Sequence, residues 1–446
     1  MWEASTAIKI TPPRALAGGF LLIICLGTML LFMPAASASG HSMGFMDALF
    51  TAMSATCVTG LIIVDTGTHF SLFGQIVLLT LVQFGGVGFM TMATWISLMM
   101  RRKISLQERL ILTESMNEGK MEGIITLTRK VFLYSIAIEA VAAIYFAIHW
   151  SRELSFSKAL YFGIFHAVSI FNNAGFELLG GFRSLTPYVD DVGMNIVSIL
   201  LIFTGGVGFI VISDLIEYPK VKKLSLHSKV VLAGSAILTV IGAIVIFAFE
   251  YTNTKTLGPL SWDTKLLASV FQSVTLRSAG VNTIDIGGLR ESTQLFMILM
   301  MFIGAAPGST GGGIKVTTFI VLFAAVGAML RGKEDVVLFR QRISKGDLYR
   351  AISVSLLAVF LLITATLLLC VFQDQNFLMI LFEAASAFGT VGLSMGLTPD
   401  LTAAGKVIIV VMMFIGRIGL VTLAYALLTK RGKELYRHPE GKIIIG

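Results

Sequence analysis

Eight long apolar blocks run through this chain of 446 residues, and they constrain its fold more than any other feature. A helix needs about 20 apolar residues to cross a bilayer, and each block supplies roughly that length or more, with few or no ionisable residues. We therefore predict an all-α membrane protein with eight transmembrane helices, in the blocks 15–33, 72–100, 131–149, 192–216, 230–249, 294–330, 351–372 and 407–428.

The composition excludes other classes of protein. Apolar residues make up 55% of the chain and charged residues 13%, whereas about a quarter of an ordinary soluble domain is charged. Disorder, a disulfide scaffold and a long coiled coil are excluded, because charge is too scarce and the apolar blocks are too long.

Lysine and arginine concentrate on one side of the predicted spans. Most of the 34 basic residues fall in the connections 101–130, 217–229 and 331–350 or near the two ends of the chain. Because cytoplasmic loops are enriched in these residues, we predict a multi-pass protein of the cell membrane with both termini in the cytoplasm. This topology accounts for the formal net charge of +8, and no nucleic-acid partner is expected. An AASAS stretch follows the first block, but the block is long for a signal peptide, so a retained helix is favoured.

The connections on the opposite side share a pattern. Each contains an apolar run of about ten residues, too short to cross a bilayer and typical of a re-entrant helix. A small, glycine-containing stretch follows each run, with the sequences TCVTGL, FNNAGF, LRSAGV and FGTVGL. Aligning these stretches places Gly60, Gly175, Gly280 and Gly392 in one column. A single loop glycine is usually a turn residue, but four at matching offsets indicate an internal fourfold repeat.

We therefore predict four pore repeats with pseudo-fourfold symmetry, each made of a transmembrane helix, a pore helix, a filter loop and a second transmembrane helix. The repeats are predicted at 1–110, 111–225, 226–340 and 341–446. Six positions before the glycine, the aligned column contains Ser54, Ser169, Val274 and Ser386.

The four glycine-containing loops have a chemistry that suits a cation. Irregular backbone at membrane depth survives only where it is buried in protein or lines a watery cavity. Loop carbonyls that face a common axis can replace the water around a dehydrated cation, and glycine allows the positive φ angles that this needs. Peptide oxygens with few carboxylates nearby suit a monovalent cation better than Ca²⁺ or Mg²⁺. The predicted ion-binding residues are Cys57, Val58, Thr59, Gly60, Asn172, Asn173, Ala174, Gly175, Arg277, Ser278, Ala279, Gly280, Gly389, Thr390, Val391 and Gly392.

The middle of the sixth block is too rich in glycine for one continuous helix. It reads GAAPGSTGGGIK over residues 304–315, and proline and glycine both disfavour a helix interior. We expect an unwound loop that lies below the filter and plugs the conduction path. Its predicted gate residues are Gly304, Pro307, Gly308, Ser309, Thr310, Gly311, Gly312, Gly313 and Lys315. For the two GGVG sequences at 85–88 and 205–208, a glycine-mediated contact between helices is the better interpretation.

Arg417 lies in the middle of the last apolar block, within the sequence GRIG. A charge at this depth is costly and usually faces the protein interior or a water-filled path. Our hypothesis is that Arg417 contacts the 304–315 loop beneath the filter and raises the barrier to cations. The alternative is an ion pair or carbonyl contact that only staples helices together.

The four repeated units resemble the Trk/Ktr/HKT superfamily of K⁺ transporters, and most closely the membrane subunits of bacterial Ktr systems. The resemblance covers nearly the whole chain. It implies that the glycine column is a selectivity filter, that the 304–315 loop is a gate with Arg417 beside it, and that the ion is K⁺. A serine replaces the first glycine in some Na⁺-preferring plant relatives, whereas this chain has Gly60. The unequal flanking residues, such as TVG at 390–392 and NNAG at 172–175, depart from a fully symmetric K⁺-channel pattern.

The sequence contains no GxxxxGK[ST] nucleotide motif. Regulation by nucleotide is therefore expected to come from another chain. The resemblance implies a cytosolic RCK-type ring that binds ATP or ADP, and a homodimer of this chain in the lipid bilayer. The basic cytoplasmic loops and the tail 430–446 are the candidates for docking the ring, and the KIIIG sequence at 442–446 is the candidate for a dimer contact. No organic cofactor is expected: K⁺ is the transported ion, and Na⁺ is left open as an activating ion.

Two rival functions stay open at this point. An alternating-access secondary cation transporter would also have broken helices and internal repeats, but all four units run in the same sense, which favours a pore. An intramembrane hydrolase using Ser309 lacks the first glycine of GxSxG and an evident histidine partner, so no enzymatic activity is expected.

Overall fold

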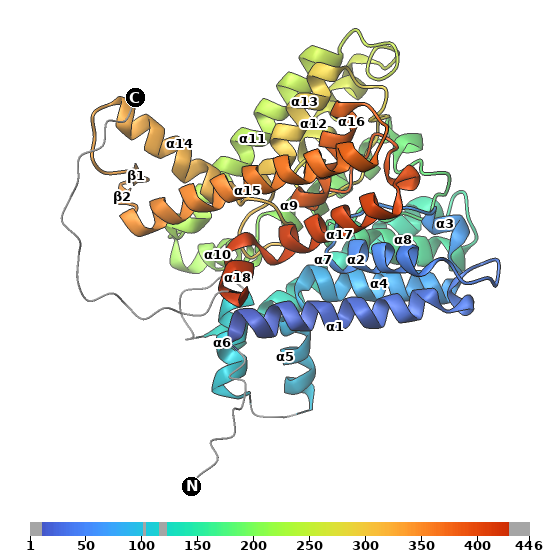
Figure 1. Ribbon diagram of the computed structural model, residues 1–446, viewed down its shortest axis with the longest axis horizontal. Helices are drawn as coiled ribbons and strands as arrows, with labels where there is room; N and C mark the ends of the chain where they lie inside the picture. Colours follow the sequence, from blue (N-terminus) through green and yellow to red (C-terminus); the bar gives the residue numbers. More distant parts are fainter. Residues whose placement is uncertain (1–10, 101–103, 116–122, 428–446) are drawn as a thin grey trace.

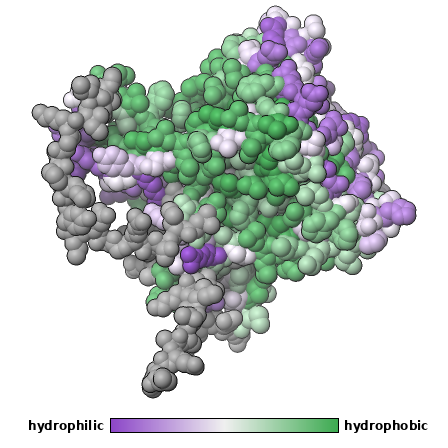
Figure 2. All heavy atoms as spheres, in the orientation of Figure 1, coloured by the Kyte–Doolittle hydropathy of each residue, from purple (hydrophilic) through white to green (hydrophobic). Residues whose placement is uncertain are grey.

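The structure is a computed structural model that describes residues 11–100, 104–115 and 123–427. Nearly all of its regular structure is helical, and the two ends of the described chain lie side by side (Figure 1). Helices α17 (Ala403–Ile418) and α18 (Leu420–Leu427) pack on α2 (Phe45–Thr56) and α1 (Pro12–Phe32). Apolar side chains cover the middle of the visible face, and hydrophilic residues gather over the loops at one end (Figure 2).

Four quarters of the chain repeat the same order of elements. Each quarter begins with a long apolar helix: α1 (Pro12–Phe32), α7 (Ile124–Trp150), α11 (Leu226–Glu250) and α15 (Lys345–Phe372). A short helix follows in each: α2 (Phe45–Thr56), α8 (Phe156–Phe171), α12 (Trp262–Thr275) and α16 (Phe377–Gly389). These short helices have 12 to 16 residues, and each contains a phenylalanine that is at most 1% exposed: Phe50, Phe165, Phe271 and Phe382.

Each quarter ends in a helix that is broken into two parts. The pairs are α4 (Leu72–Val87) and α5 (Phe89–Met99), α9 (Val192–Gly206) and α10 (Phe209–Val221), α13 (Glu291–Ile303) and α14 (Val316–Leu330), and α17 (Ala403–Ile418) and α18 (Leu420–Leu427). Short connectors complete the described chain: η1 (Pro34–Ala36), α3 (Thr66–His69), α6 (Leu106–Ser115), η2 (Thr186–Tyr188), η3 (Thr398–Asp400), and the antiparallel strands β1 (Val337–Leu338) and β2 (Gln341–Arg342).

The broken helix that ends each quarter, which we call the closing helix, begins after a capping residue at an equivalent place. Ser71, Asp191 and Thr402 each accept a hydrogen bond from the backbone N–H three residues later, which satisfies an unpaired donor of the first turn. Arg290 stands at this position in the third quarter, and the carboxylate of Glu250 at the end of α11 accepts its N–H at 3.0 Å. In this quarter a side chain of another helix therefore bonds the N–H of the residue before α13, in place of a cap to the first turn.

The broken helices correct the prediction for blocks 72–100 and 192–216. Neither block is one straight span, because the chain turns at a glycine with φ near +90°, Gly88 in the first block and Gly208 in the second. The two parts of the helix meet at 98° in the first block and at 102° in the second. The interpretation of the preceding glycines as helix contacts holds: a Cβ on Gly85 would lie 2.8 Å from the carbonyl carbon of Thr56 at the end of α2, and one on Gly205 would lie 3.2 Å from that of Phe171 at the end of α8. The predicted break in the sixth block is confirmed by the gap between α13 and α14.

Four described helices are long and apolar enough to cross a membrane alone, and the two bent pairs raise the number to six. The other two predicted spans consist of the split pairs α13–α14 and α17–α18. The predicted boundary after residue 110 falls inside α6, and the one after 340 falls in the turn between β1 and β2. Helix α6 and this hairpin are therefore connectors between quarters.

Candidate functional site

The four glycines of the repeat lie in one closed ring, which we call the glycine ring. A Cβ atom placed on Gly60, Gly175, Gly280 or Gly392 would lie 3.1, 3.2, 3.2 or 3.0 Å from the Cα atom of the next glycine, and the last of these distances joins Gly392 back to Gly60. All four have positive φ angles, from 70° to 89°. Only glycine fits these positions, because a side chain would meet both the neighbouring backbone and an unfavourable dihedral angle.

A set of peptide oxygens alternates with the glycines. The carbonyl oxygen of the residue before each glycine lies beside the glycine of the neighbouring unit: a Cβ on Gly175 would lie 3.1 Å from the oxygen of Ala279, and one on Gly280 would lie 2.5 Å from that of Val391. The four oxygens belong to Thr59, Ala174, Ala279 and Val391. The ring thus brings one carbonyl oxygen from each quarter of the chain to the same place.

The residue two positions before each glycine is also left-handed, although none of these four is glycine. The φ angles are 56° at Val58, 58° at Asn173, 83° at Ser278 and 48° at Thr390. This conformation costs about 1–2 kcal/mol for a residue with a Cβ atom and is rarest for β-branched residues such as Val58 and Thr390. Strain of this kind persists only where the surroundings fix it, and it clusters at functional sites.

Hydroxyl groups of the short helices hold the loops in this shape. Ser54 and Ser386 accept hydrogen bonds from the N–H of the ring glycine, at 3.1 and 3.0 Å. Ser169 donates to the carbonyl one residue beyond the glycine, at 2.6 Å. In the third quarter Thr275 makes this bond at 2.5 Å, so the predicted column that contained Val274 is shifted there by one residue.

Two of the predicted ion-binding residues direct their side chains away from the ring. The Asn172 amide donates to Gln83 Oε1 at 2.8 Å and to Glu139 Oε1 at 3.1 Å, and Gln83 donates to the other carboxylate oxygen of Glu139 at 3.2 Å. Arg277 donates to Thr239 Oγ1 at 2.9 Å, and its guanidinium lies 5.8 Å from the ring centroid of Phe203. Only their backbone can therefore contribute to the ring.

Residues 304–315, which we call the intramembrane loop, are anchored to the second quarter. The N–H groups of Ala306 and Thr310 donate to the carbonyls of Gly206 and Gly205 at 3.1 and 3.2 Å, and the Gly308 carbonyl accepts from Phe209 at 2.9 Å. The loop also touches the residues under the glycine ring, since Asn173 Nδ2 donates to Thr310 Oγ1 at 2.9 Å and the N–H of Gly312 donates to Thr390 Oγ1 at 2.8 Å.

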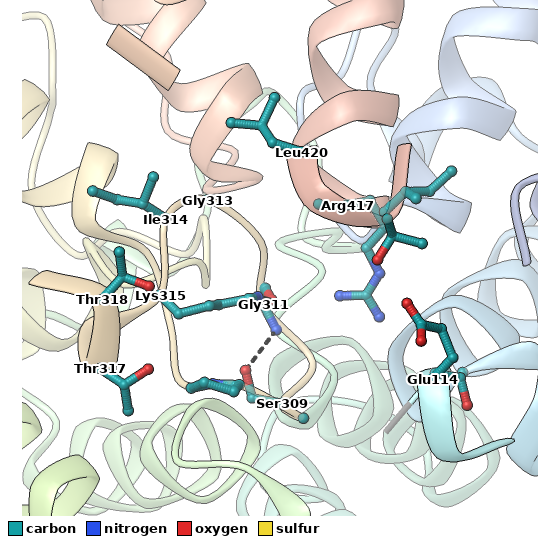
Figure 3. A pocket seen from close by; sticks show the side chains of 18 of the residues that line it. Glu114, Ser309, Gly311, Gly313, Ile314, Lys315, Thr317, Thr318, Arg417 and Leu420 are labelled. Carbon is teal, nitrogen blue, oxygen red and sulfur yellow. Dashed lines mark hydrogen bonds between the residues drawn. The ribbon is translucent and has the colours of Figure 1, made fainter. Parts of the chain in front are cut away.

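Two cationic side chains enter the site beside this loop (Figure 3). Arg417 donates to the carbonyls of Thr310 and Gly85, and to that of Gly86 at 3.3 Å. The predicted contact with the loop and the alternative carbonyl staple are therefore both present. Lys315 Nζ donates to the Gly311 carbonyl at 2.7 Å. These bonds of both cations go to peptide oxygens, which do not neutralise their charge.

A cavity of about 390 Å³ opens below the loop. Its lining comes from all four quarters and from α6, and includes Gly88, Glu114, Phe209, Ser309, Lys315, Asp347, Arg350 and Arg417. The Ser309 hydroxyl donates to the carbonyl of Ala306 at 2.6 Å, which gives it a structural partner inside the loop.

A buried carboxylate follows the ring glycine of the second quarter, in the connection after α8. Glu177, two residues beyond Gly175, is 4% exposed, and one of its oxygens accepts the N–H groups of Leu179 and Gly180. Burial raises the pKa of Glu177 to about 7, and the nearby carboxylate of Asp65 adds to the increase.

Sequence reasoning found the glycines but missed their supports. The residues two positions before the glycines are among the predicted ion-binding residues, but nothing in the spacing predicts their left-handed conformation. The Gln83–Glu139–Asn172 network carries no spacing signal, because it joins three separate elements. The column of serines six positions before the glycines was visible when the four repeats were aligned, but its role in bonding the loops was not predicted.

Comparisons with known proteins agree with this architecture. A family model described as TrkH, cation transport protein, matches residues 19–433. The Ktr system potassium uptake protein B of Bacillus subtilis is 45% identical over 98% of both chains. The potassium/sodium uptake protein NtpJ of Enterococcus hirae is 38% identical, again over 98% of both. The crystal structure of the potassium transporter TrkH from Vibrio parahaemolyticus superposes with a TM-score of 0.69 at 17% identity, covering 92% of this chain and 85% of that one.

The fold and the site define a multi-pass, all-α membrane protein built around a fourfold ring of backbone groups. The chain belongs to the TrkH family of cation transport proteins, within the Trk/Ktr superfamily, and it is similar to the B subunits of Ktr systems.

Proposed function

We propose that this chain carries K⁺ into the cell through the glycine ring, which acts as the selectivity filter. The single observation that carries the proposal is the closed ring itself, in which four glycines and four carbonyl oxygens alternate. Peptide oxygens arranged in this way replace the water around a dehydrated cation. The names of the similar potassium uptake proteins support K⁺ as the ion, and NtpJ supports Na⁺ as a second ion.

Helix dipoles support the same function. Helices α2, α8, α12 and α16 all end directly before the ring loops. Each carboxyl end carries about half a negative charge, so the four ends together favour a cation beneath the ring. These partial charges come from the backbone and are weaker than full carboxylate charges, which suits an ion that must leave as easily as it enters.

The intramembrane loop is proposed as the gate of this pathway. It lies between the glycine ring and the cavity of about 390 Å³, and both Lys315 and Arg417 add positive charge at that depth. Two cations whose described bonds go to neutral carbonyls raise the energy of a third cation nearby. Conduction then requires the loop to move aside.

The remaining proposals concern assembly and location. We propose a homodimer in the plasma membrane, with both termini in the cytoplasm and a cytosolic RCK-type ring that binds ATP or ADP. The word "system" in the names of the similar Ktr proteins supports a partner subunit. The tail 430–446, proposed for docking and dimer contact, lies outside the described residues. We further propose that the chain is not an enzyme and binds no organic cofactor.

The test is rubidium uptake into proteoliposomes in competition with Na⁺, comparing the intact chain with Gly280→Ser. We expect Gly280→Ser to lose much of its preference for rubidium, about tenfold, because a Cβ there meets Val391 and Gly392. Gly40→Ser is the matched control: Gly40 has the same φ of +72° but nothing within 4 Å of its Cβ position, so its preference should stay that of the intact chain. Equal preference in Gly280→Ser and the intact chain would contradict the filter, and uptake that saturates at low turnover would favour alternating access.

A further inference from the structure

Three of the four left-handed residues beneath the glycine ring have polar side chains, and all three are bonded at the intramembrane loop. Asn173 Nδ2 donates to Thr310 Oγ1 at 2.9 Å. Thr390 Oγ1 accepts the N–H of Gly312 at 2.8 Å, and Ser278 Oγ lies 3.4 Å from the same nitrogen. Val58 in the first quarter has no polar atom to offer.

The same residues are also bonded to one another. Ser278 Oγ donates to the carbonyl of Thr390 at 2.6 Å and lies 3.1 Å from Thr390 Oγ1. This bond joins the third and fourth quarters directly under the ring. Asn173, Ser278, Thr310 and Thr390 are all fully buried, so water does not compete for these groups in the closed arrangement.

Close packing adds to the bonds. A Cβ on Gly311 would lie 2.7 Å from Ser278 Cβ, and one on Gly312 would lie 2.7 Å from Thr390 Cγ2. The loop is therefore in contact with the ring supports at two successive glycines, and it cannot move toward or away from them without changing these contacts.

We propose that the intramembrane loop is part of the frame that holds the glycine ring, so that ion selectivity depends on the position of the loop. This inference rests on the proposed function and deepens it. When the loop moves aside to open the path, Asn173, Ser278 and Thr390 lose their bonds to the loop. Their left-handed conformation is then less well fixed, and the carbonyl oxygens one residue later shift with it.

The consequence is a coupling between gating and discrimination. In the closed arrangement the second, third and fourth quarters each contribute a side chain that is hydrogen-bonded to the loop. The residue of the first quarter, Val58, has no polar side-chain atom for such a bond. A loop that acted only as a plug would change how much ion passes, whereas a loop that braces the ring also changes which ion passes.

The test uses the full chain in proteoliposomes and measures the ratio of rubidium to Na⁺ uptake as well as total rubidium flux. Thr310→Val and Thr390→Val remove one hydroxyl each, from the loop side and from the ring side, and keep the side-chain shape. Each is expected to lower the ratio about fivefold, the fold-change that loss of one buried hydrogen bond gives. Thr310→Ser keeps the hydroxyl and should retain the ratio of the intact chain.

Ser309→Ala is the matched control in the loop, because its hydroxyl is bonded to Ala306 within the same loop and not to the ring. We expect it to change flux while the ratio stays within about twofold of the intact chain, since the ring contacts are kept. Deleting residues 308–313 should raise flux and lower the ratio. Adding Thr390→Val to the deletion should lower the ratio little further, because the N–H of Gly312 is already gone and only the contact with Ser278 is left to lose.

Two outcomes separate this inference from the proposed function. If the intact chain takes up no rubidium above empty liposomes, the proposed function fails. If the intact chain prefers rubidium, and both valine variants fold and raise flux at an unchanged ratio, the loop is only a plug and the coupling is wrong. Thermal unfolding of each variant in detergent shows whether it is folded, and the two valine variants test the same interface independently.

Discussion

At the residue scale, the site depends on backbone dihedral angles more than on side-chain chemistry. Each quarter places a left-handed residue, one further residue and a left-handed glycine in succession, as in Val58 to Gly60. This alternation lets peptide groups from four units meet at one axis. The side chains act as braces: Ser54 and Ser386 hold the glycine N–H groups, and Asn173 and Thr390 contact the intramembrane loop.

At the same scale, Glu177 makes the stability of the folded protein depend on pH. Its pKa is about 7 in the folded protein, against a usual value of 4.5, because burial disfavours the charged form. The folded state therefore binds the proton more tightly than the unfolded state, and stability falls as pH rises from about 4.5 through 7. We expect the thermal midpoint to be lower at pH 8 than at pH 6.

Glu177→Gln should remove this contribution, because the amide stays neutral while its oxygen can still accept from Gly180. Its midpoint at pH 8 should exceed that of the intact chain, with each pKa unit worth about 1.4 kcal/mol. If the thermal midpoint of the glutamine variant depended on pH in the same way as that of the intact chain, Glu177 would be ionised in the folded protein.

At the element scale, the closing helix of every quarter is broken at the depth just below the ring. Gly88, Gly208 and Gly419 turn the chain with φ angles of 90°, 91° and 86°, and residues 304–315 replace the single glycine in the third quarter. The long loop thus occupies the place of a tight turn. The extra residues reach inward to α9 and to the ring supports.

Gly88 and Gly208 form a matched pair for testing this packing. Alanine at either position is strained by about 1–2 kcal/mol, because both have φ near +90°. At Gly208 a Cβ would also lie 2.7 Å from the Pro307 carbonyl oxygen, whereas at Gly88 the nearest atom is Thr91 Oγ1 at 3.8 Å. We expect Gly208→Ala to lower the thermal midpoint further than Gly88→Ala. Equal losses would mean that the loop moves away from α10 at no cost.

At the scale of the whole molecule, the four quarters form a ring that must close between the first and the last. Lys406 at the start of α17 pairs with Asp47 at the start of α2, with 2.6 Å between Nζ and Oδ1, and the side chains are only 16% and 30% exposed. This ion pair lies where the chain ends meet, so it supports the closure on which the glycine ring depends.

A double-mutant cycle with Asp47→Asn and Lys406→Met tests this closure. We expect a coupling energy of about 1 kcal/mol in unfolding by SDS in mixed micelles, because the pair is largely screened from water. The exposed pair Asp335–Arg342, at 3.5 Å with side chains 47% and 70% exposed, is the control and should show almost none. A coupling near zero at Asp47 and Lys406 would assign ring closure to apolar packing alone.

The sequence by itself determined the membrane class, the four units and the ring glycines. The apolar blocks and the repeated glycine spacing are local properties of the chain, and they are set by bilayer thickness and by the dihedral angles that only glycine adopts freely. The break at 304–315 and the depth of Arg417 were predictable for the same reason.

Only the tertiary structure decided what surrounds those glycines. The bends at Gly88 and Gly208, the one-residue shift to Thr275, the Gln83–Glu139–Asn172 network and the bonds from the ring to Thr310 and Gly312 all join segments far apart in the chain. Hydrogen bonds between distant segments depend on how four folded units pack around one axis, and no local pattern of residues encodes that arrangement.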